Sequence, residues 1–510
     1  MNSQSSLVGM PMSSLLRVPL EVLVYIASYL TTSEYGALRL ACRRIENDLF
    51  DSFAKEFFIK RQFMISEFSL QALVDISMSR LGPYLKYLII SLERPTPRYS
   101  DPNIHPGSFP TIRDALNYHI FYEECINHQA LITTGQDLEL LIQAFHNLPA
   151  LETVSLRDFS RDGRHRDGRD GLWHAYGAPT FLKQTGRKFV QPDFFHPIGD
   201  IVAVDSTPFI CHTFWIMLQA LGKTKEMHSS PRFEVILRQS HLPDIAFKIP
   251  RYLEPTILPV IENLKALFLD VGRHTYHSLV TTDEGDCQSN AAFLLGTFLS
   301  KTKSLEHLRL NFRGGRAQET QDILQWLAHV PKSDGALQFP ITANYVADAD
   351  SVQRLFPKLP QTPEFPHLQQ LDLGMLTIEL PLLVDIFKRY KASLRKFSLH
   401  KVSFSSPPDT DTTGPVNLWP RFFRQITEHG FTLTAVHLSF LTQVYGIAKF
   451  PVEFRDPGQS PTAGIRSTKG WTGTDWERNS HDFIKSMFID WHGEDELWLD
   501  YTSESTEDLD

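Results

Sequence analysis

Cysteine is scarce in this chain of 510 residues, and the four that occur form no recognisable motif. Cys42, Cys125, Cys211 and Cys287 lie far apart without a C-x-x-C pair, so we expect neither a zinc site nor a disulfide framework. The glycosylation pattern Asn-x-Ser/Thr does not occur anywhere in the chain. Both absences favour an intracellular protein of the cytoplasm, the nucleus or both.

Long apolar runs and basic clusters are also missing. No apolar run approaches the ~20 residues that cross a bilayer, and the first residues lack a basic segment followed by an apolar one. We therefore expect no membrane contact and no signal peptide. The formal net charge is -9 and no polybasic run occurs, which argues against nucleic acid as a partner.

Local signatures of catalysis are absent as well. The chain contains no Walker-type phosphate loop, no G-x-G-x-x-G, no H-E-x-x-H and no G-x-S-x-G. His274 and His277 form an H-x-x-H pair beside Asp270 and Asp283, a weak indication of a metal site, since a chain with 20 histidines produces such pairs by chance. We predict no enzyme activity, no metal and no cofactor, although a site assembled from distant residues would leave no local motif.

What the chain does contain is enough apolar material for a large core, because hydrophobic residues make up 42% of it and charged residues 21%. Its N-terminal part, 15–63, is the most informative. Pro19 suits the first turn of a helix, and apolar residues follow at helical spacing. Thr31 and Glu34 have the spacing of a capping box before a second helix, and a third follows from Ile45. Three short helices cannot bury so wide an apolar surface among themselves, so either a partner or the rest of the chain must cover it.

This stretch resembles an F-box. The order Pro19-Leu20-Glu21-Val22-Leu23, Ile26, Leu30, then Leu38-Arg39-Leu40-Ala41-Cys42-Arg43 matches that motif, with Val18 in place of the usual Leu. The following run is similar to fungal F-box proteins as far as about Ser91. The resemblance implies a Skp-family adaptor as partner and, through it, the cullin and RING subunits of an SCF-type ubiquitin ligase. It implies the following adaptor-binding residues: Pro19, Val22, Leu23, Ile26, Leu30, Leu38, Leu40 and Cys42. The alternative is that these are ordinary core residues of a helical lobe.

The rest of the chain repeats the pattern L-x-x-L-x-L, often after a helical segment. The pattern starts at Leu85, Leu151, Leu264, Leu305, Leu368, Leu394 and Leu433. Such alternation predicts an α/β (α+β) fold in which a three-helix F-box precedes an irregular leucine-rich-repeat-like solenoid. The starts share no single period, and the expected Asn or Cys after each strand is mostly missing, so a non-repetitive α/β domain remains the alternative.

These patterns predict the following organisation. We expect a disordered N-terminus at 1–11, the F-box helical module at 12–60, a helical linker at 61–80, the repeat-like body at 81–450 with an insertion at about 157–235, and a Trp-rich capping segment with an acidic tail at 451–510. Within the insertion, RDFSRDGRHRDGRD mixes five Arg with four Asp, which favours a solvated loop.

The predicted function is substrate recognition: the module would bind the adaptor, and the body would hold an unknown target protein near the conjugating enzyme. The alternatives are a scaffold without a role in degradation and an α/β enzyme without a local motif. On this prediction, replacing Leu23 and Ile26 together by Asp abolishes adaptor binding. The target-binding residues cannot be named from sequence.

Overall fold

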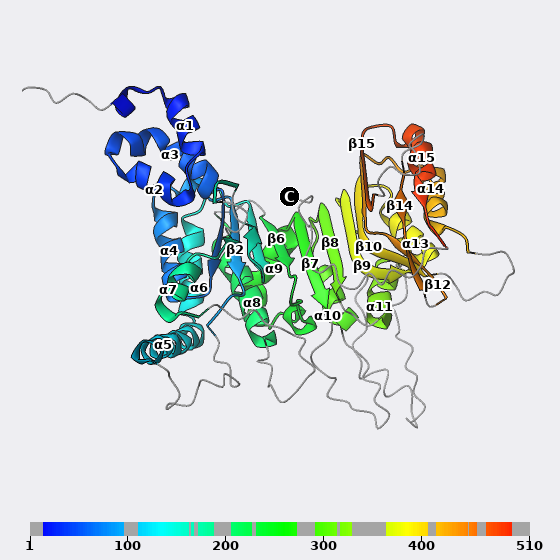
Figure 1. The fold of residues 1–510 in the computed structure, drawn as a ribbon. Helices are drawn as coiled ribbons and strands as arrows, with labels where there is room; N and C mark the ends of the chain where they lie inside the picture. The colour runs from blue at the N-terminus through cyan, green and yellow to red at the C-terminus, as the bar shows by residue number, and fades with distance from the viewer. Residues whose placement is uncertain are drawn as a thin grey trace, which may run out of the picture. The chain divides into compact units, whose positions relative to one another are not determined.

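The computed structural model describes twelve stretches of the chain: 14–95, 111–162, 165–167, 172–187, 206–226, 231–272, 291–313, 317–328, 364–405, 415–446, 448–455 and 466–491. They belong to two compact units, 1–242 with 250–260 and 243–249 with 261–510. Each unit is mixed α/β, with parallel strands in sequence order that alternate with helices (Figure 1). The predicted disorder at 1–11 lies outside the described residues.

Unit 1 begins with the three predicted helices, which form a group of their own beside α4 (Figure 1). The elements are η1 (Ser14–Arg17), α1 (Leu20–Ser28), α2 (Thr32–Leu40) and α3 (Arg43–Phe57). The capping box is confirmed, because the Thr31 hydroxyl accepts from the Glu34 amide and the Glu34 carboxylate accepts from the Thr31 amide. The helices enclose a small core of their own: Leu23, Ala27, Tyr35, Ile45, Leu49 and Phe57.

A parallel sheet follows in unit 1. Its strands are, in order, β1 (Lys60–Met64), β2 (Tyr87–Ser91), β3 (Thr153–Arg157) and β6 (Arg232–Ile236). The helices are α4 (Glu67–Met78), η2 (Gly82–Tyr84), α5 (Ile112–Thr134), α6 (Gln136–His146), α7 (Ala178–Thr185) and α8 (Thr207–Lys223). A short hairpin of β4 (Arg161–Asp162) and β5 (Leu172–Trp173) brackets η3 (His165–Asp167).

Two strands of the parallel sheet of unit 1 were not predicted. β1 occupies the start of the expected helical linker at 61–80, and the linker is helical from Glu67 to Met78, in α4. The last three residues of β1 are buried. β1 has the sequence KRQFM and begins with three polar residues, so no apolar alternation marks it as a strand. β6 lies at the end of the expected insertion and carries no L-x-x-L-x-L pattern.

Unit 2 holds a second set of parallel strands. They are β7 (Ala266–Gly272), β8 (His307–Arg313), β9 (Gln370–Ile378), β10 (Lys396–Ser405) and β11 (Ala435–Ser439). β15 (Thr468–Thr472) pairs antiparallel with β11, β12 (Thr442–Tyr445) pairs with β10 and with β13 (Ala448–Pro451), and β14 (Glu453–Phe454) pairs with β16 (Met487–Phe488). The helical elements are η4 (Asp244–Phe247), α10 (Ala291–Leu299), α11 (Ala317–Ala328), α13 (Leu380–Tyr390), α14 (Leu418–Glu428) and α15 (Trp476–Lys485). Helix α9 (Glu254–Asn263) has residues in both units.

The leucine pattern predicted its strands correctly. Each of its seven occurrences lies on a strand (β2, β3 and β7 to β11), and helices α10 and α13 precede β8 and β10. Alternate side chains point to the helices: the Phe397 ring of β10 packs edge-on against Phe387 of α13 and Phe422 of α14. At the C-terminal side Trp476 is buried between Phe423 and Phe483. None of the described helices is both long and apolar enough to cross a bilayer.

Candidate functional site

Helix α1 is apolar on two opposite faces. Leu23 and Ala27 point into the core of the module and are almost fully buried. On the other side, the four side chains of Val22, Tyr25, Ile26 and Tyr29 are 45%, 63%, 38% and 71% exposed. Their i, i+3, i+4, i+7 spacing aligns them along one side of the helix. We call these four residues the α1 stripe.

Further apolar side chains of the module are exposed near the helix ends. Leu20, in the first turn of α1, is 49% exposed, and Leu40, the last residue of α2, is 85% exposed. Pro19 precedes α1 and is also exposed. Single exposed apolar residues are common on protein surfaces, but a helix with an apolar stripe opposite its buried face is typical of binding surfaces.

The structure divides the eight predicted adaptor-binding residues into two groups of four. Pro19, Val22, Ile26 and Leu40 are exposed and can reach a partner. Leu23 belongs to the core of the module, and Leu30, Leu38 and Cys42 are half-buried against that core. Tyr25 and Tyr29 were not predicted, although their spacing from Val22 and Ile26 would have placed them on the same stripe.

The corner between α1 and α2 is held by the short η3 segment. The Arg166 guanidinium donates to the carbonyls of Ala27 and Leu30 at 2.9 and 2.8 Å, at the C-terminal end of α1, where a cation is favoured. The Asp167 carboxylate accepts from the amide and the hydroxyl of Thr32 at 2.7 and 2.6 Å, at the start of α2. One loop thus satisfies the ends of both helices.

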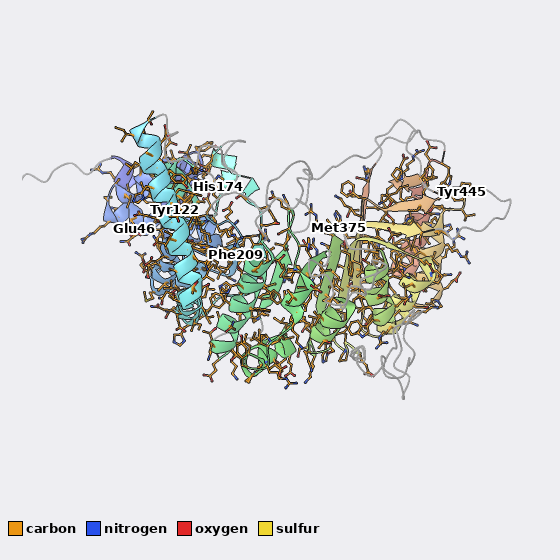
Figure 2. The ribbon with its side chains drawn as sticks, turned by 90° about the horizontal axis from the view of Figure 1, so that it is seen from below. Glu46, Tyr122, His174, Phe209, Met375 and Tyr445 are labelled. Carbon is orange, nitrogen blue, oxygen red and sulfur yellow. The ribbon has the colours of Figure 1, made fainter. Side chains whose placement is uncertain are left out.

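Helix α3 attaches the module a second time to the rest of unit 1. Arg80 lies 3.4 Å from the carboxylate of Glu46, which is labelled in Figure 2, and the Tyr84 hydroxyl donates to Asp51 at 2.8 Å. The Phe50 ring lies edge-on to Tyr84. None of these contacts uses the α1 stripe. The module is therefore fixed through α3 and the α1–α2 corner, while the stripe stays exposed.

The expectation of a solvated loop at 157–170 was wrong at the start of this run, where 157–159 are buried, while Asp167 near its end is exposed. Arg157 and Asp158 are 2% and 1% exposed. The Asp158 carboxylate accepts four hydrogen bonds of 2.6 to 2.8 Å, three from the amides of 238–240 and one from the Ser240 hydroxyl. Arg157 and Arg166 pair with Glu234 and Glu56, which lie outside this run, and local composition cannot show such long-range partners.

Metal chemistry receives no support from the residues that can be assessed. The described stretches hold no group of three His, Cys, Asp or Glu that could bind a metal ion. Of the H-x-x-H pair and its neighbours, only Asp270 lies in a described stretch, where it accepts a hydrogen bond from Asn311 at 2.8 Å. Among the described residues, Cys42, Cys125 and Cys211 form no disulfide bond, and Cys287 lies outside the described residues.

The α1 stripe is thus the candidate functional site: an apolar helix face on an anchored module, suited to packing against apolar side chains of another protein. Comparison with protein-family models and with curated proteins found no match to this chain.

Proposed function

We propose that this chain is the substrate-recognition subunit of an SCF-type ubiquitin ligase and that its three-helix module binds a Skp-family adaptor. The α1 stripe carries the proposal, because it is exposed on a module whose core and attachments are complete without it. Fully burying an exposed large apolar side chain gains roughly 1.5–3 kcal/mol, and the four stripe residues, which are about half exposed, would gain roughly half of that each, which offsets part of the cost of association.

The unit 2 strands support a repeat-like body that holds the target. Register pairs Leu267, Leu308, Leu371, Phe397 and Val436 in one row across five strands, although these residues are unequally spaced in the sequence. Stacked apolar rows with variable connections are the arrangement expected of an irregular leucine-rich-repeat-like solenoid. In this proposal the body holds a target protein, and the cullin and RING subunits reach the chain through the adaptor.

Co-purification of the adaptor with the full chain tests the docking surface. Replacing Val22 and Ile26 by Asp places two charges, one turn apart, on the stripe and leaves the buried Leu23 in place. We expect this variant to lose the adaptor while retaining its helical content. Adaptor recovery equal to that of the unmodified chain would refute the docking surface.

A matched control lies on α5. Ile112 and Leu116 have the same i, i+4 spacing, and their side chains are 92% and 56% exposed. Tyr122, which lies further along the same helix and is labelled in Figure 2, is 48% exposed. Replacing Ile112 and Leu116 by Asp makes the same chemical change away from the module, so adaptor recovery should not change. Protein half-lives after deletion then separate a ligase subunit, which leaves a few proteins longer-lived, from a scaffold.

A further inference from the structure

The strands of unit 2 carry a polar face opposite their helices. In β10, Phe397 and Leu399 point to the helices, so Ser398 and His400 point to the other side. Register aligns Arg309, Asp372, Ser398 and His437 in one row across β8 to β11, and Asn311, Gly374, His400 and Ser439 in the adjacent row. We call the side chains of these two rows, with Lys401, the polar face.

Backbone geometry repeats on three neighbouring strands at the edge of this face. Met375, Lys401 and Phe440 have φ values of 57°, 52° and 52°, and each directly follows a member of the row Gly374, His400 and Ser439 (Met375 is labelled in Figure 2). Left-handed backbone is uncommon for residues other than glycine. The bend interrupts the strand alternation, so Lys401 is exposed between half-buried His400 and buried Val402.

Several cations gather at this bend. The Lys401 ammonium lies 6.0 Å from the centre of the Phe440 ring. The centre of the His400 ring lies 5.8 Å from the centre of the same Phe440 ring. Burial, assisted by the positive charges of Lys401 and Arg309, lowers the pKa of His400 to about 4. Partial burial also lowers the pKa of Lys401, and the positive charges of Arg313 and Lys449 contribute to this shift. These basic groups are close enough to repel one another.

The acids on the same face are already engaged. Asp372 lies 2.6 Å from the Nε2 atom of His307, and Asp270 accepts from Asn311. In the part of the chain that the structure describes, no carboxylate pairs with Lys401 or Lys449. A ligand that brings negative charge would relieve the repulsion among the basic groups and complete their ion pairs.

We propose that the polar face binds an acidic segment of a partner protein, with Arg309 and Lys401 of that face and the neighbouring Lys449 of β13 contacting carboxylate or phosphate groups. Strands lie about 4.8 Å apart, so the distance from β8 to β11 is roughly 14 Å, which corresponds to about four residues of extended peptide. This width suits a peptide with several anionic side chains better than a single small anion. The proposal rests on the proposed function only in identifying that partner as the target.

Fluorescence anisotropy with the full chain tests the binding. The probes are a labelled peptide that alternates Glu with Ser, the same peptide with phosphoserine, and a neutral peptide with Gln in place of Glu. Replacing Lys401 and Lys449 by Gln should weaken binding of the acidic probes about tenfold, and added salt should weaken binding to the unmodified chain. The neutral peptide should not bind. The two acidic probes show whether carboxylate or phosphate is preferred.

The control variant replaces Lys301 and Lys391, two exposed lysines outside the polar face, by Gln. It changes net charge equally and should bind the acidic probes as the unmodified chain does. The proposal is overturned if neither acidic probe binds at low salt, if both variants bind equally, or if a single-stranded oligonucleotide of equal charge binds more tightly. If only this proposal fails, the adaptor still co-purifies normally with these variants. If the adaptor does not co-purify even with the unmodified chain, the proposed function itself fails.

Discussion

Arg166 and Glu56 form a fork-to-carboxylate ion pair that joins the η3 segment to the end of α3. The Nε and Nη2 atoms of Arg166 lie 2.6 Å from the two carboxylate oxygens of Glu56, and the Arg166 side chain is only 10% exposed. The same guanidinium lies near the Tyr35 and Phe57 rings of the module core. A single side chain thus links all three helices of the module to a loop more than a hundred residues later.

Replacing Arg166 by Ala should loosen the module. The variant loses two bonds to a carboxylate and two to helix-end carbonyls, and we expect local stability to fall by roughly 2–4 kcal/mol. Lys should rescue it only in part, because an ammonium cannot reproduce the planar fork. Hydrogen exchange of the amides in 20–57 measures the effect. Replacing the exposed Arg251 by Ala is the control, and equal exchange in both variants would contradict the role of Arg166.

His128 should make unit 1 less stable in weak acid. Its Nδ1–H donates to the Ile65 carbonyl at 2.8 Å, and burial lowers the pKa of His128 to about 4. The unfolded chain, with a histidine pKa near 6.5, therefore binds more protons between about pH 6.5 and 4. Stability should fall as pH falls through this window, by up to about 1.4 kcal/mol per pH unit, and should level off below it.

The variant His128→Asn tests this assignment, because an amide can keep the donor to Ile65 but does not titrate. Urea unfolding at several pH values should show a smaller decrease in stability toward pH 4.5 for the variant than for the unmodified chain. His400, whose pKa is lowered to a similar value, titrates in both proteins and cancels from the comparison. An identical pH dependence of the two proteins would show that His128 is not responsible.

A side chain at Gly374 should destabilise the fold because the Asn311 side chain occupies the space that a Cβ atom would need. A Cβ atom at Gly374 would lie 2.2 Å from the Asn311 Oδ1 atom and 3.1 Å from the His400 carbonyl oxygen. Replacing Gly374 by Ala should therefore displace the Asn311 side chain from Asp270, at a cost of roughly 1–3 kcal/mol. A double variant with Asn311→Ala should cost less than the two single changes added together. Additive costs in urea unfolding would contradict this close approach.

Sequence predicted the secondary structure best where one periodicity dominates. The three N-terminal helices and the seven leucine-pattern strands have regular apolar spacing, and their positions are confirmed. β1 (KRQFM) and β6 (RFEVI) were missed because each is only five residues long and neither carries that pattern. The bends at Met375, Lys401 and Phe440 carry no glycine, so the usual marker of left-handed backbone is missing.

The candidate site was predictable as a region but not residue by residue. α1 is apolar around most of its circumference, so spacing alone cannot show whether Leu23 or Ile26 faces the core. That choice depends on where α3 packs, and on a loop that reaches α1 from residues 165–167. Such long-range contacts leave no trace in the local pattern.

Leu23 and Ile26 should therefore behave differently when each is replaced by Asp, although sequence alone treats them as one surface. Leu23 is 3% exposed and Ile26 is 38% exposed. Leu23→Asp buries an unpaired charge and should unfold the module, which raises hydrogen exchange throughout 20–57. Ile26→Asp should leave exchange unchanged and still reduce adaptor recovery, because the charge lies only on the stripe. If Ile26→Asp also unfolds the module, or if it binds the adaptor normally, the stripe is not an independent docking surface.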